Sequence, residues 1–293
     1  MPTRTAIITG AARGIGHATA RILQAQGLKV ALIDRDADAL NEATNALPGS
    51  LPYLCDVSQP DQVDQMAAEM TAKLGRVDVL INNAGVADFG PLEDTNFQRW
   101  RRVMETNLDG VFLCSQALLP ALKSSCGAIV NIASISGLRA STLRVAYGTS
   151  KAAVIHLTQQ QAVELGEFGI RANCVAPGPV RTKLAMAVHS DEIIAAYHDA
   201  IPLNRYGSED EIAEVISFLA SEKASFVTGQ LIACDGGFEA TGIGLPALRQ
   251  QAERSTEWSK LEIFQYPTQK TYFNMRVTSW SLAVQGAARP HWL

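Results

Sequence analysis

The sequence of 293 residues lacks the marks of several large protein classes. No stretch approaches the roughly 20 apolar residues that a membrane-spanning helix needs. The first ten residues, MPTRTAIITG, contain an apolar run too short for a secretion signal. No run of basic residues stands out and the net charge is −4, which argues against a nucleic-acid partner or an anionic membrane. We therefore expect a cytoplasmic protein with neither of these partners.

Cysteine is scarce and scattered. The five cysteines are odd in number and show no CxxC spacing, so neither a disulfide framework nor a zinc site is supported. We expect reduced, buried thiols and no metal site. The cysteines are Cys55, Cys114, Cys126, Cys174 and Cys234.

Apolar residues are abundant instead. They make up 47% of the chain and charged residues 18%, which is typical of a globular protein with a buried sheet and not of a disordered one. The length allows one large domain or two small ones with a sizeable core.

Short β-rich runs alternate with longer helical patterns along most of the chain. The runs are almost continuously apolar, which is typical of parallel strands that are buried on both faces. This alternation predicts a single doubly wound, Rossmann-type α/β domain over residues 1–244, with about seven parallel strands and helices on both faces. Strands are expected at 5–9, 30–34, 53–57, 78–82, 128–134, 171–177 and 230–235, and helices from about 15 to 26 and at 36–46, 60–74, 97–122, 147–168 and 208–221.

The composition changes after this domain. Residues 245–293 form an atypical C-terminal extension that is rich in aromatic residues. Its segment YFNMRVTSW alternates apolar and polar side chains, which predicts a half-buried strand at 272–280. The extension packs on its own domain or on a neighbouring subunit, or it has no role; the sequence leaves these alternatives open.

A glycine-rich loop, TGAARGIG, follows the first strand and contains Gly10, Gly14 and Gly16. Glycines allow a tight turn and a close approach of the backbone to a ligand. A pyrophosphate could then bind the free N–H groups of a helix that begins near Ile15. The alternative is a glycine-rich turn without a ligand.

The second strand ends in Asp34, about twenty residues after the glycines. An acidic side chain there can accept hydrogen bonds from the adenosine ribose hydroxyls and repels a 2′-phosphate, which favours NAD over NADP. Arg13 and Arg35 instead favour NADP, because a nearby cation could accommodate the 2′-phosphate. Asp34 could also serve as the N-cap of the next helix.

The segment YGTSK places Tyr147 and Lys151 four residues apart, so both side chains lie on one face of a helix. Such a pair is by itself most often a solvated helix face. Joined with TGAARGIG, NNAG at 82–85, Asn107, Ser134 and PGPVRT at 177–182, it resembles the short-chain dehydrogenase/reductase family. The resemblance covers about residues 4–240 and implies a Rossmann-fold oxidoreductase that uses NAD or NADP.

The resemblance also implies the roles of individual residues. Ser134, thirteen residues before Tyr147, is favoured over Ser136 as the catalytic serine. The implied catalytic residues are Asn107, Ser134, Tyr147 and Lys151. The expected cofactor-binding residues are Gly10, Arg13, Gly14, Ile15, Gly16, Asp34, Asp56, Val57, Asn83, Ala84, Gly85, Tyr147, Lys151, Pro177, Gly178, Val180 and Thr182.

The expected reaction is hydride transfer between nicotinamide and a carbinol carbon, with Tyr147 as the general acid/base. A cation about 5 Å away at an effective dielectric of about 20 favours the phenolate by about 3 kcal/mol, and Lys151 is placed to supply it. Asn107 is expected to act through a water on Lys151. Gly148 is expected to leave room for the nicotinamide.

We expect NAD as the cofactor and a small secondary alcohol, polyol or sugar, or the matching ketone, as the substrate. The alternatives are an NADPH-dependent 3-oxoacyl-[acyl-carrier-protein] reductase and a non-enzymatic NAD-binding scaffold. The loops 87–95, 137–144 and 183–205 are expected to set specificity; Arg139 and Arg144 there could attract an anion or lie in solvent. The resemblance further implies a homotetramer or homodimer.

Overall fold

The computed structural model describes residues 3–182, 186 and 189–242. The C-terminal extension and the strand expected at 272–280 lie outside these residues, and the boundary predicted after residue 244 stays a prediction. No helix of the described ranges is long and apolar enough to cross a membrane.

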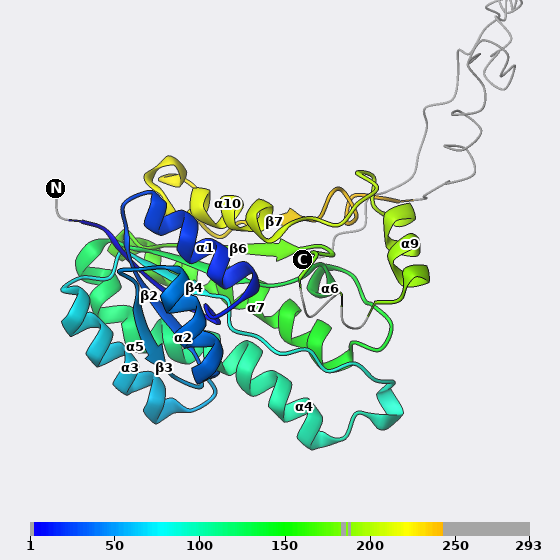
Figure 1. The fold of residues 1–293 in the computed structure, drawn as a ribbon, viewed down its shortest axis with the longest axis horizontal. Coiled ribbons are helices and arrows are strands. Elements are labelled where there is room, and N and C mark those ends of the chain that lie inside the picture. The colour runs from blue at the N-terminus through cyan, green and yellow to red at the C-terminus, as the bar shows by residue number, and fades with distance from the viewer. Residues whose placement is uncertain (1–2, 183–185, 187–188, 243–293) are drawn as a thin grey trace, which may run out of the picture. The chain divides into compact units, whose positions relative to one another are not determined.

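Seven parallel strands form one sheet, as the apolar runs predicted (Figure 1). Their order is β3-β2-β1-β4-β5-β6-β7, and every neighbouring pair is parallel. The order reverses between β1 and β4, where a doubly wound sheet opens a crevice for a ligand. The strands are β1 Thr5–Thr9, β2 Lys29–Asp34, β3 Leu51–Leu54, β4 Val79–Asn82, β5 Ala128–Ile132, β6 Arg171–Pro177 and β7 Leu231–Cys234.

Alternate side chains of the strands pack into different layers of the core. Ile8 packs in a cluster with Leu23 of α1, whereas its neighbour Ile7 packs in a cluster with Met66 of α3 and Leu118 of α5. Both faces of the sheet are therefore covered, which explains the continuous apolar runs. The helices on the first face are α1 Gly14–Ala25, α2 Ala37–Ala46 and α10 Glu209–Ala220, and those on the second are α3 Pro60–Leu74, α5 Gly110–Ser125 and α7 Val145–Leu165 (Figure 1).

The helix expected at 97–122 is interrupted. The structure has α4 Phe97–Met104, a π-helical turn at Glu105–Asp109, and then α5. A π-helical turn shifts the hydrogen bonds from i−4 to i−5 and often marks a functional site. Asn107 lies in this turn.

Three other elements differ from the predictions. The strand expected at 53–57 begins and ends earlier, as β3, because its pairing with β2 ends at Leu54 opposite Asp34. Two helices were not predicted: α6 Ile135–Leu138, and α9 Asp191–Ala200 within the expected loop 183–205. Short 3₁₀ turns lie at Leu92–Asp94, Gly166–Phe168 and Glu222–Ala224.

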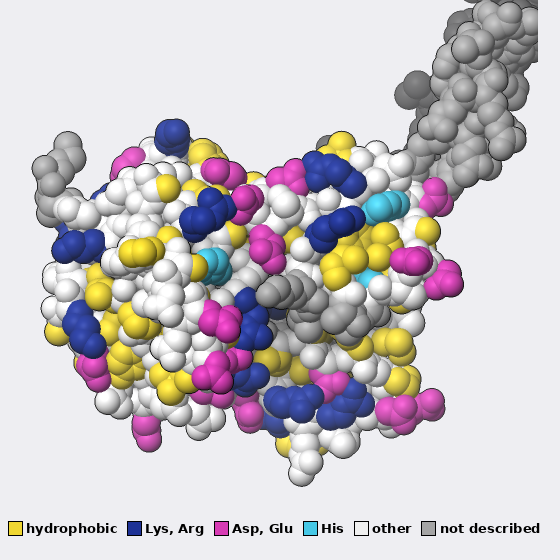
Figure 2. Space-filling view, in the orientation of Figure 1, with side chains coloured by type: hydrophobic (Ala, Val, Ile, Leu, Met, Phe, Trp, Pro, Cys, Tyr) yellow, Lys and Arg dark blue, Asp and Glu magenta, His cyan; other side chains and the backbone are white. Residues whose placement is uncertain are grey.

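The cysteines are free, as expected, but not all are buried. Cys126 is exposed and Cys234 is half-buried. Cys126 ends α5 in the left-handed region, with φ 51°, and this turn at the helix end carries its side chain to the surface. On the face drawn in Figure 2, acidic and basic side chains are interspersed.

Candidate active site

The glycine loop after β1 is packed tightly against the end of β4. Gly10 has φ 63°, and a Cβ atom there would lie 2.8 Å from the Cα of Ala84. A Cβ atom on Gly16 would meet the Gly10 carbonyl and lie 2.5 Å from Nδ2 of Asn83. That Nδ2 donates hydrogen bonds of 3.0 Å to the carbonyls of both Thr9 and Gly10. The NNAG segment therefore braces the loop, and no larger side chain fits at either glycine.

The N-terminus of α1 is open to an anion. The helix begins at Gly14, one residue before Ile15, and its N-cap residue Arg13 makes no side-chain cap. In contrast, α2 and α10 are capped by the side chains of Asp36 and Ser208. Uncapped N–H groups at the positive end of a helix bind phosphate well, so these residues fit a dinucleotide pyrophosphate.

Asp34 lies beside this loop, at the carboxyl end of β2. Its carboxylate accepts hydrogen bonds from the backbone N–H groups of Ala12 (3.0 Å) and Asp36 (3.1 Å). The N-cap of α2 is Asp36, which accepts from the N–H of Ala39. The alternative role of Asp34 as a helix cap is therefore wrong.

Both arginines near Asp34 have carboxylate partners. Arg13 forms an ion pair with Asp36, and Nη1 of Arg35 lies 3.5 Å from Oδ2 of Asp56. Neither cation is therefore free to meet a 2′-phosphate without giving up a carboxylate partner. Val57, next to Asp56, packs under the start of α5, where a Cβ atom on Gly110 would lie 2.7 Å from Cγ2 of Val57.

Lys151 is a buried cation behind Tyr147. Both lie in the first two turns of α7, and Nζ of Lys151 is 5.9 Å from the centre of the Tyr147 ring. This Nζ donates a 2.8 Å hydrogen bond to the carbonyl of Ile132 at the end of β5. Only 3% of Lys151 is exposed, and this burial lowers its pKa to about 8.

The pKa of Tyr147 is raised above its usual value of 10, because burial disfavours the phenolate. The hydrogen bond with Ser134 and the charge of Arg144 oppose this rise. Burial therefore outweighs the groups that favour the phenolate, and the expected lowering of this pKa by Lys151 stays a prediction. Gly148 was expected to leave room for the nicotinamide. In the structure a Cβ atom on Gly148 would lie 2.9 Å from the carbonyl oxygen of Ser136, so this glycine leaves room for the backbone of α6.

Ser134 follows β5 and faces Tyr147. Its hydroxyl caps α6 by accepting the N–H of Ser136 at 3.1 Å, and the same side chain lowers the pKa of the neighbouring Tyr147 phenol. The hydroxyl of Ser136 instead accepts a hydrogen bond from Nη1 of Arg144 at 3.1 Å. The two serines thus have different partners, and Ser134 is the one that contacts Tyr147.

Asn107 holds the backbone after NNAG in place. Its Oδ1 accepts the N–H of Val86 at 2.8 Å, and its Nδ2 donates to the Val86 carbonyl (2.9 Å) and to Oγ of Ser150 (3.0 Å). The side chain is completely buried. A Cβ atom on Gly85 would lie 3.4 Å from both Oδ1 of Asn107 and Nζ of Lys151, so the two groups approach each other on one side of that glycine.

A cavity of about 260 Å³ lies in front of these residues, at the carboxyl ends of β4, β5 and β6. The predicted site residues that line it are Ile15, Asn83, Gly85, Ser134, Tyr147, Lys151, Pro177, Gly178, Val180 and Thr182. The others lie outside its lining: Gly10, Arg13, Gly14, Gly16 and Asp34 at the first two βα turns, Ala84, Asp56 and Val57 beside them, and Asn107 behind Val86.

The outer wall of the cavity consists of Phe89, Arg144, His189 and Tyr197, all within the loops expected to set specificity. Tyr197 comes from α9, whose start carried a readable signal: Ser190 caps it, and acidic residues fill its first turn.

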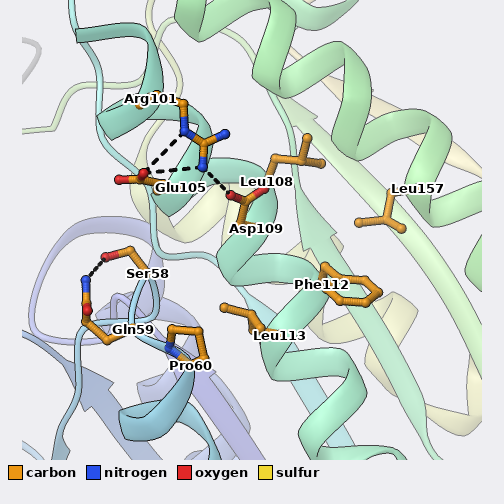
Figure 3. A pocket seen from close by; sticks show the side chains of 10 residues that line it. All are labelled: Ser58, Gln59, Pro60, Arg101, Glu105, Leu108, Asp109, Phe112, Leu113 and Leu157. Atoms are coloured by element: carbon orange, nitrogen blue, oxygen red, sulfur yellow. Dashed lines mark hydrogen bonds and ion pairs between the residues drawn. The ribbon is translucent and has the colours of Figure 1, made fainter. Parts of the chain in front are cut away.

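A larger hollow of about 690 Å³ lies elsewhere, beside the π-helical turn (Figure 3). Its charged groups are paired, since Arg101 lies between Glu105 and Asp109 at 3.3 and 3.2 Å. Its apolar wall includes Phe112 of α5 and Leu157 of α7 (Figure 3). None of the predicted catalytic residues lines it, so the smaller cavity is the candidate active site.

Comparison with known proteins supports the resemblance seen in the motifs. A family profile described as enoyl-(acyl carrier protein) reductase matches residues 10–239. Meso-2,3-butanediol dehydrogenase of Serratia marcescens is 39% identical over 240 residues, which is 81% of this chain and 95% of that protein. The 3-oxoacyl-[acyl-carrier-protein] reductase FabG of Thermotoga maritima is 38% identical over 239 residues, 80% of this chain and 97% of that protein.

A solved structure leads to the same family. The crystal structure of levodione reductase matches with a TM-score of 0.78 and 33% sequence identity, over 82% of this chain and 98% of that one. The chain therefore belongs to the short-chain dehydrogenase/reductase family and is an NAD(P)-dependent oxidoreductase of alcohols and ketones.

Proposed function

We propose that this chain is an NAD-dependent dehydrogenase of secondary alcohols, or a reductase of the matching ketones, with Tyr147 as the general acid/base. The observation that carries the proposal is the meeting of Ser134, Tyr147 and Lys151 at one cavity beside an open helix N-terminus. The bound nicotinamide would accept or supply the hydride. The side chains described below bind the substrate and move its proton.

Tyr147 exchanges a proton with the substrate oxygen. During oxidation its phenolate takes the hydroxyl proton, and during reduction its phenol returns one. Ser134, which lines the same cavity, donates its hydroxyl hydrogen to the same substrate oxygen as charge develops there. The two groups fix the oxygen in one position.

Lys151 and Asn107 act on the site from its buried side. Lys151 is held by the Ile132 carbonyl and is buried, so its charge acts through a medium of low dielectric. It would also bind the nicotinamide ribose. Asn107 holds Val86 and approaches Lys151 across Gly85, so it is placed to complete a proton path by way of a water.

NAD is the proposed cofactor in preference to NADP. Asp34 presents a carboxylate beside the glycine loop, where it would bind the adenosine ribose, and Arg13 and Arg35 are engaged by Asp36 and Asp56. A 2′-phosphate would meet a negative charge and no free cation. The direct test is the ratio of kcat/KM for NAD⁺ and NADP⁺ with one alcohol.

The reduction of 3-oxoacyl groups on a carrier protein is the second candidate, because a relative 38% identical carries that name. That reaction is expected to use NADPH, and the carboxylate of Asp34 disfavours the 2′-phosphate of that cofactor. A panel of alcohols, diols and ketones, assayed beside a 3-oxoacyl thioester with each cofactor, separates the candidates. Turnover of the thioester alone, with NADPH, would contradict the proposal.

We also propose a homotetramer or homodimer in the cytoplasm. Phe112 of α5 is 48% exposed and Val163 of α7 is 81% exposed, so both long helices present apolar side chains that a second subunit would cover. Light scattering coupled to size exclusion measures the assembly, and a monomer would contradict it. Cell fractionation tests the location.

A further inference from the structure

Arg144 is the one cation on the outer wall of the cavity, within the described part of the chain, and the proton transfer does not employ it. It directly precedes α7. Its Nη1 donates to Oγ of Ser136 at 3.1 Å, and its Nη2 donates to the phenol oxygen of Tyr197 at 3.2 Å. Both partners are neutral hydroxyls, so the positive charge is hydrogen-bonded without being neutralised.

No carboxylate of the described residues pairs with Arg144, although ten other arginines there each have such a partner. Arg171 is satisfied differently, by the backbone carbonyls of Leu219 and Ser221, and Arg181 is exposed to solvent. Arg144 is half-buried at a cavity. A guanidinium in such a place is stabilised when an anion from a ligand completes it.

The surroundings hold the guanidinium in one orientation. Its central carbon lies 4.9 Å from the centre of the Phe89 ring, and that ring meets Tyr147 edge-on at 6.4 Å. Tyr197, whose hydroxyl accepts from Nη2, is itself stacked on His189 at 5.5 Å. A flat fork held against an aromatic ring and by two hydroxyls suits a planar carboxylate on an otherwise apolar molecule.

Arg144 is also close to the reacting oxygen. It lies three residues before Tyr147, and both side chains contact the ring of Phe89. It is joined to Ser134 through Ser136, which donates its N–H to Ser134 and accepts from Arg144. A substrate whose reacting oxygen lies between Ser134 and Tyr147 can therefore bring a group that is a few bonds from that oxygen to Arg144.

We propose that Arg144 binds a carboxylate of the substrate, so that the preferred substrates are hydroxy acids or oxo acids whose carboxylate lies a few carbons from the reacting carbon. The proposal rests on the proposed function for the reaction itself. In oxidation, the carbinol C–H bond breaks and its hydrogen leaves with the electron pair as hydride, which bound NAD⁺ would accept. The O–H proton goes to Tyr147, a C=O bond forms, and the carboxylate is unchanged.

The test compares acids with neutral molecules of the same shape. The full chain is assayed on 3-hydroxybutyrate and 4-hydroxycyclohexanecarboxylate, each beside its carboxamide, as the unaltered protein and as Arg144→Met, Arg144→Lys and Arg139→Met. Arg139 is the matched control, because it lies on the same loop but is paired with Glu239 and donates to the carbonyl of Thr241, outside the cavity lining.

We expect the unaltered protein to prefer at least one acid over its amide by about tenfold or more in kcat/KM. Arg144→Met should abolish this preference, mainly through KM for the acid, and Arg144→Lys should keep part of it because the charge stays while the fork is lost. Arg139→Met should behave as the unaltered protein. Equal use of acid and amide by the unaltered protein would overturn the proposal, and so would an equal loss on both in Arg144→Met.

A binding measurement separates this proposal from the proposed function. Titration calorimetry with cyclohexanecarboxylate and cyclohexanecarboxamide, with and without NADH, needs no turnover. We expect saturable binding of the acid to the unaltered protein and to Arg139→Met, and about tenfold or weaker binding to Arg144→Met. Acid binding through Arg144 in a protein that oxidises no alcohol would refute the proposed function alone. Oxidation of neutral alcohols without acid binding would refute the role of Arg144 alone.

Discussion

The ammonium of Lys151 is fixed to the end of β5 by a 2.8 Å hydrogen bond to the carbonyl of Ile132. Ser134 follows two residues later in the chain, so the same strand end positions the cation and the serine that lines the cavity with Tyr147. Burial lowers the pKa of Lys151 to about 8 and raises that of Tyr147. The two groups most needed for proton transfer are therefore both pushed toward their neutral forms.

The pH dependence of oxidation follows from these directions. The phenolate of Tyr147 is the reactive form and its pKa is raised, so kcat/KM should rise by about one log unit per pH unit through the neutral range. Above about pH 8 the charge of Lys151 is lost as well, which disfavours the phenolate further, so the rise should become shallower there. Ketone reduction needs the phenol, which predominates here because the pKa of Tyr147 is raised, so its kcat/KM should stay nearly constant up to about pH 8. Rates from about pH 6 to 10 in both directions check this, and a flat oxidation profile with chemistry rate-limiting would contradict it.

Lys151→Met should lower kcat/KM for oxidation by about 100-fold. Loss of a cation about 5 Å from the phenolate, at an effective dielectric of about 20, removes about 3 kcal/mol of stabilisation. Lys73→Met, at an exposed lysine paired with Glu69, is the control and should have no effect on the rate. Unchanged kinetics in Lys151→Met would mean that the cation does not act on Tyr147.

Asp34→Asn tests the basis of cofactor choice. The amide keeps the size of the side chain and one acceptor for the loop N–H groups, but it removes the charge that faces a 2′-phosphate. The ratio of kcat/KM for NADP⁺ over NAD⁺ should rise about tenfold. Asp61→Asn, at the exposed first turn of α3, should leave the ratio unchanged. An unaltered protein that prefers NADP⁺ from the start would refute the role given to Asp34.

Two glycine substitutions separate backbone strain from crowding. At Gly27, φ is 89° and no atom lies within 4 Å of a Cβ position, so Gly27→Ala should cost only about 1–2 kcal/mol of unfolding free energy. At Gly16 the added methyl group would meet the Gly10 carbonyl and Asn83, so Gly16→Ala should cost about 3 kcal/mol and also weaken NADH binding. Thermal unfolding and NADH fluorescence measure both effects. Equal stability of the two variants would show that the loop is not tightly packed.

The sheet could be predicted because its strands are buried on both faces, and such burial demands unbroken apolar runs such as TAIIT. The π-helical turn at Glu105–Asp109 could not, since no composition or period distinguishes it from the helices on either side. The start of α9 carried a capping signal at Ser190 that the loop assignment overlooked.

The inner part of the site follows from the motifs residue by residue, whereas its outer wall could be predicted only as a set of loops. The segments YGTSK and NNAG keep Tyr147, Lys151 and Asn83 together because they sit at strand ends and helix starts fixed by the fold. Arg144 and Arg139 look alike in the sequence, as two arginines on one loop. Only the three-dimensional contacts separate them: Arg139 pairs with Glu239, and Arg144 turns to Tyr197.

Tyr147→Phe tests the central claim most directly, because it removes one hydroxyl and keeps the ring that meets Phe89. The measurement is kcat for oxidation of an accepted alcohol with NAD⁺, beside the Kd for NADH of the same preparation. We predict that turnover falls by about 10³-fold or more, while the Kd for NADH changes less than about threefold. A variant that binds NADH normally and keeps substantial turnover would contradict the assignment of Tyr147 as the general acid/base.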